Sequence, residues 1–194
     1  MGATPRWRVA IVDDHERSRA ALRGAIRAAG GEVAGEALRC VDAVPLIKRT
    51  VPDVSIFAVG LPDGDGVDAA AHAIVATDCP VIVFTSHTDV ELVARAREAG
   101  VMAYLLKPLR AAELGPAVDL AIARFAENRQ LRQTLEGRKY IERAKGVLMT
   151  RFGLAEEEAF RRLRRAAMDS RKSMVDIAKA LLVSESVAHD LPAR

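Results

Sequence analysis

Two groups of polar and charged side chains carry the chemistry that this sequence can perform. In the first half of the chain, four polar residues stand at or just after the ends of short apolar runs: Asp13, Asp14, Thr85 and Lys107. In the second half, residues 124–172 hold 14 Lys and Arg against 7 Asp and Glu, a net charge of +7 in a chain whose total is +3. A segment with such a surplus of positive charge can interact with polyanions. The sequence therefore predicts a polar pocket in one half and an anion-binding surface in the other.

The elements that would position the first group are short strands that alternate with helices. Apolar or β-type runs predict five strands, at residues 8–12, 32–37, 54–59, 81–85 and 103–106. The stretches between them have helical apolar spacing, and Gly30 and Gly31 end the first one. This alternation is typical of an α/β fold with a five-stranded parallel sheet that is covered on both faces. In such folds ligands bind at the carboxyl ends of the strands, where the polar residues stand.

A long helical pattern without a break begins at Ala111. Side chains spaced by four and three residues form a heptad seam, which predicts a coiled-coil homodimer through Leu114, Val118, Ala121, Phe125, Asn128 and Leu135. A shifted frame through Leu131 fits almost as well, and the alternative is one long helix that packs on its own chain. Gly137 interrupts the pattern, so we expect the linker to cover residues 111–137.

Three short helices with a shared core are expected in residues 138–183. Ile141, Ala144 and Leu148 lie on one face of the first of these helices. Met149, Phe152 and Phe160 recur at helical spacing, which favours core positions over base-stacking roles. Ser173 opens a capping box for the third helix. The tail at residues 184–194 carries no readable signal.

Composition excludes several classes of protein. The chain has 194 residues, enough for one ordinary domain and a small second one. Aromatic residues make up only 4 %, which disfavours a stacking surface for single-stranded nucleic acid. The two cysteines form no CxxC, which argues against a structural zinc site, and no apolar run is long enough to span a membrane. From the lack of such a run we expect a cytoplasmic protein with no membrane contact. Because no nucleophile and base stand at catalytic spacing, we also expect that it is not an enzyme.

The first half resembles the receiver domain of bacterial response regulators, a CheY-like fold, over about Trp7 to Leu120. Asp13 and Asp14 match the acidic pair of that family, which holds magnesium. The family's hydroxyl, switch aromatic and lysine match the residues Thr85, Tyr104 and Lys107. The resemblance also implies an aspartate that accepts a phosphoryl group four residues before the turn proline, Pro62. That position holds Ala58, and a methyl group cannot act as a nucleophile.

The loss of this carboxylate predicts a pseudo-receiver, with domain bounds 1–110, that is not switched by aspartyl phosphate. Magnesium loses one direct ligand, so we expect no cofactor, or weak binding of Mg²⁺ at Asp13 and Asp14. Lys107 is then free to pair with Asp13 or Asp14. The alternative is a conventional, phosphorylation-activated regulator in which residue 58 has been changed by engineering. In either case a sensor kinase or another regulatory protein is an expected partner.

The second half resembles the ANTAR domain of the AmiR and NasR antitermination regulators, from about Arg138 to Leu182. The resemblance rests on Ala-Lys-Gly-Val-Leu-Met at 144–149 and Ala-Phe-x-x-Leu-Arg at 159–164. It implies a small all-α three-helix domain that binds stem-loops of an mRNA leader and allows transcription to pass a terminator. The candidate RNA contacts are Lys139, Arg143, Lys145, Gly146, Arg151, Arg171 and Lys172. A DNA-binding factor is the less favoured alternative, because no helix-turn-helix sequence is recognisable.

Overall fold

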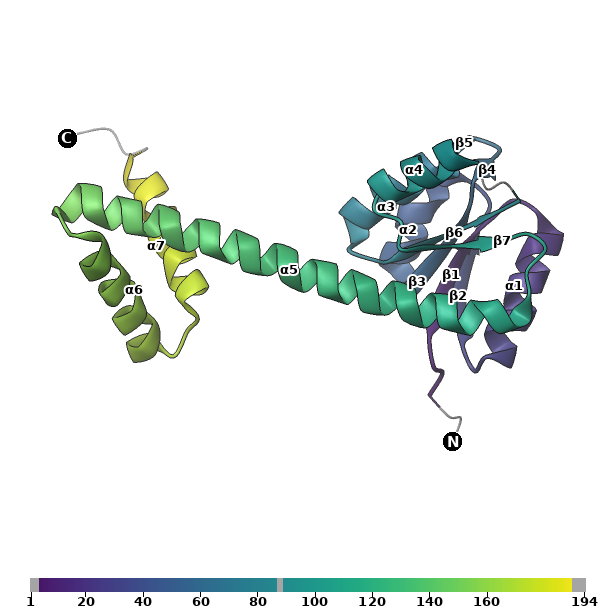
Figure 1. The fold of residues 1–194 in the computed structure, drawn as a ribbon, viewed down its shortest axis with the longest axis horizontal. Coiled ribbons are helices and arrows are strands. Elements are labelled where there is room, and N and C mark those ends of the chain that lie inside the picture. Colours follow the sequence, from purple (N-terminus) through teal and green to yellow (C-terminus); the bar gives the residue numbers. More distant parts are fainter. Residues whose placement is uncertain (1–3, 87–88, 190–194) are drawn as a thin grey trace. The chain divides into compact units, whose positions relative to one another are not determined.

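The computed structural model describes residues 4–86 and 89–189 and divides the chain into two compact units (Figure 1). The first, Met1–Glu127, is the α/β unit, and the second, Asn128–Arg194, is the helical unit. The first unit extends beyond residue 110, where the sequence placed its boundary, because the start of a long helix packs into its core. Within the described ranges, no helix combines the length and the apolar character needed to cross a membrane.

A five-stranded parallel sheet forms the centre of the α/β unit, as predicted. Its order is β2-β1-β3-β6-β7. The strand bounds are β1 Arg8–Val12, β2 Glu32–Ala37, β3 Val54–Ala58, β6 Val81–Thr85 and β7 Ala103–Leu106. The residues of β3 and β6 are buried throughout, since helices cover both faces of the sheet. A two-stranded hairpin, β4 (Gly60–Leu61) with β5 (Gly64–Asp65), follows β3.

Two apolar layers hold the helices to the sheet. The helices of this unit are α1 Glu16–Ala28, α2 Cys40–Thr50, α3 Gly66–Thr77, α4 Val90–Glu98 and the first part of α5, which spans Ala111–Phe152. Leu22 and Ile26 of α1 share one layer with the start of α5. Leu46 of α2 and Ala73 of α3 lie in the other layer. Each layer removes the apolar face of its helices from water, which is the main stabilising contribution.

The first half of the predicted dimer seam is buried by its own chain. Leu114, Val118 and Ala121 are fully buried in the layer that contains α1, and Phe125 is also buried in the core of the α/β unit. These four positions are therefore wrong as a dimer seam, and the alternative of a helix packed on its own chain holds for them. The spacing misled because a helix that covers a sheet shows the same three- and four-residue repeat as a coiled coil. Leu131 and Leu135 are exposed.

Gly137 does not interrupt α5, which runs without a break from Ala111 to Phe152. A Cβ atom at this position would lie 2.9 Å from Cγ2 of Val175, so the absence of a side chain allows a close approach of the last helix. The linker predicted at 111–137 is thus the first part of one longer helix. The first helix of the three-helix segment is the end of that same helix.

The helical unit contains the end of α5 together with α6 (Glu156–Ser170) and α7 (Met174–His189). Its core joins side chains from all three helices: Ala144, Leu148, Ala159, Leu163 and Ala178. The predicted cap is present, since Oγ of Ser173 accepts a hydrogen bond from the backbone N–H of Asp176 at 3.1 Å. The helix continues beyond residue 184 to His189, and residues 190–194 of the expected tail lie outside the described part of the chain.

Candidate functional site

Asp13 lies at the centre of a polar pocket at the carboxyl ends of the strands. Its side chain is fully buried just after β1, and Nζ of Lys107 lies 2.8 Å from its Oδ2 atom. Oδ1 accepts a hydrogen bond from the backbone N–H of His15 at 2.8 Å. The predicted pairing of Lys107 with the acidic pair is therefore present, with Asp13 as the partner. Both oxygens of this carboxylate are used within the protein.

The residue at the position of the expected phosphoryl acceptor is a buried methyl group. Ala58 ends β3 and is 2 % exposed, and Thr85, which ends the neighbouring strand β6, is also buried. Gly66 holds the backbone after Ala58, because its N–H donates to the carbonyl of Val59 at 2.6 Å. A Cβ at Gly66 would overlap the Ala58 carbonyl oxygen, at 1.8 Å. Tyr104 is half-exposed, so its ring is not enclosed with these groups.

Arg19 is a residue of this pocket that the sequence pattern did not reveal. Its Nη1 donates to the backbone carbonyl of Asp13 at 2.8 Å, and its Nε donates to Oε2 of Glu36 at 2.9 Å. The side chain is largely buried between α1 and β2, and it also pairs with Glu16. Arg19 therefore fixes the backbone that presents Asp13. An arginine that faces inward from an otherwise apolar helix face was the available signal.

An exposed basic face lies on the part of α5 that belongs to the helical unit. Lys139, Arg143 and Gly146 are exposed and follow one another at helical spacing of four and three residues, which places them on one side of the helix. Lys139 and Arg143 make no ion pair with any residue that the structure describes. A Cβ at Gly146 would meet no atom within 4 Å, so packing does not explain the glycine. Arg171 and Lys172, between α6 and α7, are also exposed.

Lys145 and Arg151, two further predicted RNA contacts, form ion pairs that link helices. Lys145 is only 7 % exposed, and its Nζ lies 2.8 Å from Glu142 and 2.7 Å from Glu156. The hydrogen bond with Glu142, followed by that with Glu156, raises the pKa of Lys145 above its usual value. Arg151 pairs with Glu185 of α7. Both cations are thus already paired, which makes them weaker candidates for phosphate contacts than Lys139 and Arg143.

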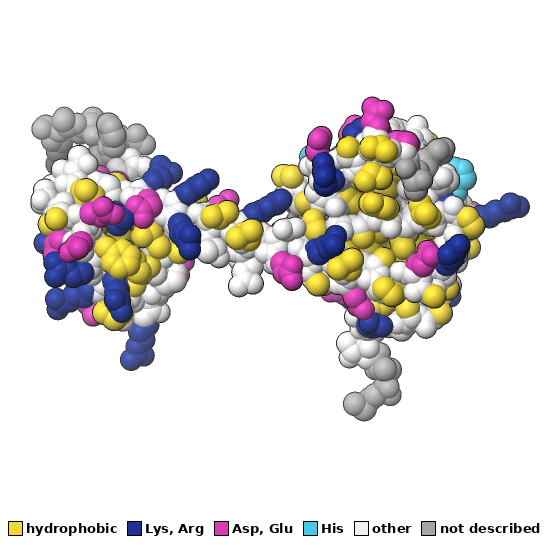
Figure 2. All heavy atoms as spheres, in the orientation of Figure 1, with side chains coloured by type: hydrophobic (Ala, Val, Ile, Leu, Met, Phe, Trp, Pro, Cys, Tyr) yellow, Lys and Arg dark blue, Asp and Glu magenta, His cyan; other side chains and the backbone are white. Residues whose placement is uncertain are grey.

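The apolar residues expected in the core of this unit are partly at its surface. Phe152 and Met149 are exposed, and Phe160 is 41 % exposed, so the expectation that these three are core residues is wrong. Phe160 follows Ala159 on α6, and it is Ala159 that fills the core. On the face shown in Figure 2, hydrophobic side chains of this unit gather in a patch that is bordered by both cations and acids.

Comparison with known proteins supports the family resemblance of both halves of the chain. The model of the response regulator receiver domain matches residues 9–119, which is more than half of the chain, and the model of the ANTAR domain matches residues 129–182. The chain belongs to the ANTAR-type response regulators. The α/β unit is therefore its receiver domain, and the helical unit holds its ANTAR domain.

Two relatives and one solved structure illustrate this membership. The transcriptional regulatory protein PdtaR of Mycobacterium tuberculosis is 41 % identical over 187 residues, covering 93 % of this chain and 91 % of the relative. The nitrate regulatory protein of Klebsiella oxytoca is 51 % identical over 57 residues, or 29 % of this chain and 14 % of the relative. The signal receiver domain of a modulated diguanylate cyclase from Desulfovibrio desulfuricans G20 has a TM-score of 0.59 at 30 % identity, covering 63 % of this chain and 98 % of that structure.

The residues of this receiver do not fit the magnesium ion that the receiver family implies. Ligand atoms of Asp13, Asp14 and His15 lie within 4.8 Å of one another, but protein donors already engage both carboxylates. Lys107 pairs with Asp13, and Nδ1 of His15 lies 2.7 Å from Oδ1 of Asp14. The side chain of Ala58 supplies no oxygen where a third carboxylate ligand would stand. Magnesium prefers six oxygen ligands at short distance, so this set is unsuitable for it.

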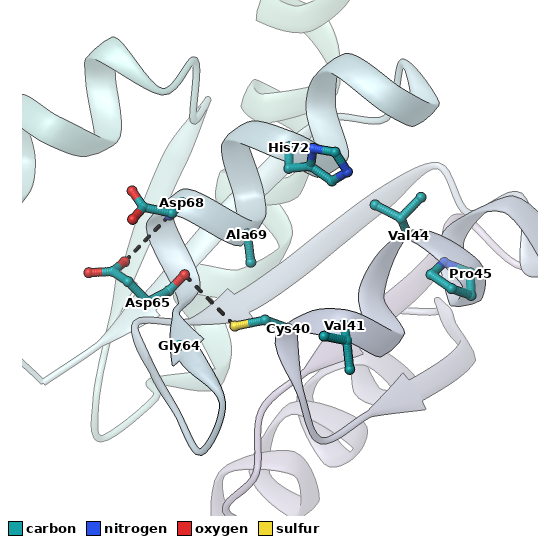
Figure 3. Close-up of a pocket in the computed structure, with 9 residues that line it drawn as sticks. All are labelled: Cys40, Val41, Val44, Pro45, Gly64, Asp65, Asp68, Ala69 and His72. Carbon is teal, nitrogen blue, oxygen red and sulfur yellow. Dashed lines mark hydrogen bonds between the residues drawn. The ribbon is translucent and has the colours of Figure 1, made fainter.

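A cavity of about 550 Å³ in the receiver lies between α2 and α3 (Figure 3). Its walls carry mostly apolar groups, with Cys40 at one side and His72 at the other. Burial, followed by the charge of Asp63, raises the pKa of the Cys40 thiol to about 11, so this sulfur is not a ready nucleophile. None of the lining residues belongs to the Asp13 pocket.

Proposed function

We propose that this response regulator binds RNA through its ANTAR domain and acts in transcription antitermination. One observation carries the proposal: the exposed face of α5 where Lys139 and Arg143 stand beside Gly146 with no ion pair of their own among the described residues. Unpaired cations attract phosphates, and a helix surface without a side chain allows a nucleic acid backbone to come close. The surplus of positive charge over residues 124–172 supports the same interpretation.

The proposed ligand is a stem-loop in the leader of a nascent mRNA. Binding would hold the stem-loop in a form that excludes an overlapping terminator, so that transcription continues. Such a role places the protein in the cytoplasm, where transcripts are made. The mechanism needs no covalent chemistry from the ANTAR domain, since affinity for one RNA fold over another is enough to shift their populations.

Competition binding tests this proposal. Full-length protein is titrated into a fluorescent stem-loop RNA and, separately, into duplex DNA of equal length at matched salt. We expect tighter binding to the RNA stem-loop, by at least about tenfold. Equal affinity for both would leave only release of counterions from any polyanion and would refute sequence-specific RNA binding. Tighter binding to the DNA would favour the DNA-binding alternative.

We further propose that the receiver is not switched by aspartyl phosphate. The support is the buried methyl group of Ala58 and the ion pair that already occupies Asp13. Incubation with a small phosphodonor should leave the chain unmodified. Stable phosphate on the protein that is released by hydroxylamine would contradict this. Because Asp13, Thr85 and Lys107 are retained, a natural receiver altered at residue 58 is the second candidate, and restoration of phosphate uptake in Ala58→Asp would favour it.

The homodimer that the heptads predict is now proposed through a shorter segment of α5. Leu131 and Leu135 are the seam positions that remain exposed, close to Asn128. Exposed leucines separated by one turn provide an apolar stripe that a second copy would cover. Sedimentation across micromolar concentrations should show a dimer that Leu131→Glu converts to a monomer. A wild-type monomer throughout would refute it. A sensor kinase or other regulatory protein remains the proposed partner of the receiver.

A further inference from the structure

A cavity of about 500 Å³ in the ANTAR domain is bordered by an exposed aromatic ring and by groups of both charges. It lies between α5 and the beginning of α6, and its lining residues are Lys145, Glu156, Glu157, Phe160 and Arg161. Phe160 is 41 % exposed and does not belong to the buried core cluster of this unit. Because this large part of an apolar side chain stays in water, the exposed part of Phe160 is available for contact with a ligand.

We propose that this cavity receives an unpaired nucleobase from the loop of the bound RNA, with the base stacked on the ring of Phe160. The inference rests on the proposed RNA-binding function and names the part of the RNA that is read. In a duplex, the faces of each base are stacked on neighbours and its edge is paired, so only an unpaired base can enter such a cavity. Aromatic side chains provide a platform of this kind in many RNA-binding modules.

The polar groups of the cavity match the edge of a base, which offers both donors and acceptors. The ammonium of Lys145 has three N–H donors, and Glu142 and Glu156 take two of them. The carboxylates of Glu156 and Glu157 are exposed and can accept hydrogen bonds from base N–H groups. The guanidinium of Arg161, which pairs with Glu158, lies at the border, where a loop phosphate would be attracted.

A base fits this cavity better than the side chain of an apolar partner would. An apolar occupant would remove the two exposed carboxylates from water without replacing their hydrogen bonds, which is unfavourable. A base replaces those hydrogen bonds and covers the Phe160 ring as well. The positive charge of the surrounding segment also favours a polyanion.

The test uses the full chain and a pool of RNA hairpins with one fixed stem and a randomised loop. Hairpins retained by the wild-type protein are sequenced, and the best binder is then made with one abasic site at each loop position in turn. Affinities are measured for the wild type and for Phe160→Ala, Phe160→Tyr and Met168→Ala. Met168 is the matched control, because it is 64 % exposed on the same helix and does not line the cavity. Circular dichroism melts confirm that each variant is folded.

Phe160→Ala is expected to weaken binding of the intact hairpin by about 10- to 100-fold, which is the range for removal of a base stack. Phe160→Tyr, which keeps the ring, and Met168→Ala should bind within a few-fold of the wild type. At one loop position the abasic RNA should bind the wild type and Phe160→Ala equally, because the stacking partner is already missing.

Two results would overturn the base pocket while RNA binding itself stands. One is a Phe160→Ala variant that binds hairpins as well as Met168→Ala does. The other is a loss of affinity that is the same for every abasic position, or that appears as a change of oligomeric state in sedimentation, which would assign Phe160 to contact with a second copy. Failure of the wild type to retain any hairpin would instead refute the proposed function, and the base pocket with it.

Discussion

Substitution of Gly146 by alanine should change folding stability and RNA affinity in opposite directions. This glycine lies inside α5, away from either end, and a Cβ at this position would meet no atom within 4 Å. Glycine in a helix interior is less favourable than alanine by about 0.5–1 kcal/mol, because more backbone freedom is lost on folding. Gly146→Ala is therefore expected to stabilise the ANTAR domain by about that amount. The melting temperature of a domain of this size should rise by roughly 3–6 °C.

The same methyl group should weaken RNA binding. If the phosphate backbone passes between Lys139 and the end of α5 by lying against Gly146, an added Cβ moves it outward and lengthens the hydrogen bonds that Arg143 donates to it. We expect affinity to fall by about fivefold or more, which is the scale of one impaired hydrogen bond to a charged group. Thermal melts by circular dichroism and fluorescence anisotropy with a stem-loop RNA measure the two effects on the same preparation.

Gly24→Ala is the matched control. Gly24 lies inside α1, and a Cβ there would also meet no atom within 4 Å. This variant should stabilise the receiver by a similar amount and leave RNA affinity unchanged. If Gly146→Ala lowers the melting temperature, the space around the helix is not open as described. If it raises stability and leaves RNA affinity unchanged, close approach of RNA at Gly146 is refuted.

Three other predictions concern the folded core. Lys107→Met should destabilise the receiver by about 3 kcal/mol in urea unfolding, because it leaves the buried Asp13 carboxylate unpaired; Lys107 is 24 % exposed, so the lower end of the range applies. Adding Asp13→Asn should recover most of the loss, and additive effects would argue against the pair. Burial raises the pKa of the Cys79 thiol from 9.0 to about 11. The buried, protonated thiol therefore contributes to folding stability below pH 9, and this contribution is lost as the pH rises through 11. The difference between wild type and Cys79→Ala should therefore change by about 3 kcal/mol across that window, and a constant difference would contradict the assigned burial. Gly137→Ala should lower the melting temperature of the ANTAR domain despite the better helix propensity of alanine, since its Cβ meets Val175 at 2.9 Å; stabilisation instead would show that α7 can move away.

The sheet was predictable because its strands are short apolar runs whose burial follows from their composition. Residues 54–58 and 81–85 are buried at every position, and Asp13 and Lys107, which follow β1 and β7, are in contact. The pairing of Lys107 with the acidic pair was also predictable. Because residue 58 has no carboxylate, Asp13 and Asp14 are the acidic partners that the sequence offers to the Lys107 ammonium. Both predictions concern a single parallel sheet, in which the residues that follow the strands all lie at the same edge.

The function of α5 was not predictable from its periodicity. The repeat that contains Leu114 and Val118 serves equally for a partner helix or for a sheet in the same chain, and only the tertiary structure decides between them. The sequence predicts an interruption at Gly137 because the neighbour that explains this glycine, Val175, lies far away in the sequence. The sequence indicates Lys145 as an RNA contact, but it could not reveal the ion pair with Glu156, which is on another helix.

The most direct test of RNA binding by the α5 face is the salt dependence of affinity. The double variant Lys139→Ala with Arg143→Ala is compared with Lys48→Ala with Arg49→Ala, which removes the same charge from exposed positions on α2 of the receiver. If the α5 face binds the stem-loop, the first variant alone should bind more weakly. The slope of log affinity against log salt should then fall by roughly one for each phosphate that the variant no longer neutralises. Equally weakened binding in both variants, or an unchanged slope in the first, would contradict RNA binding by this face.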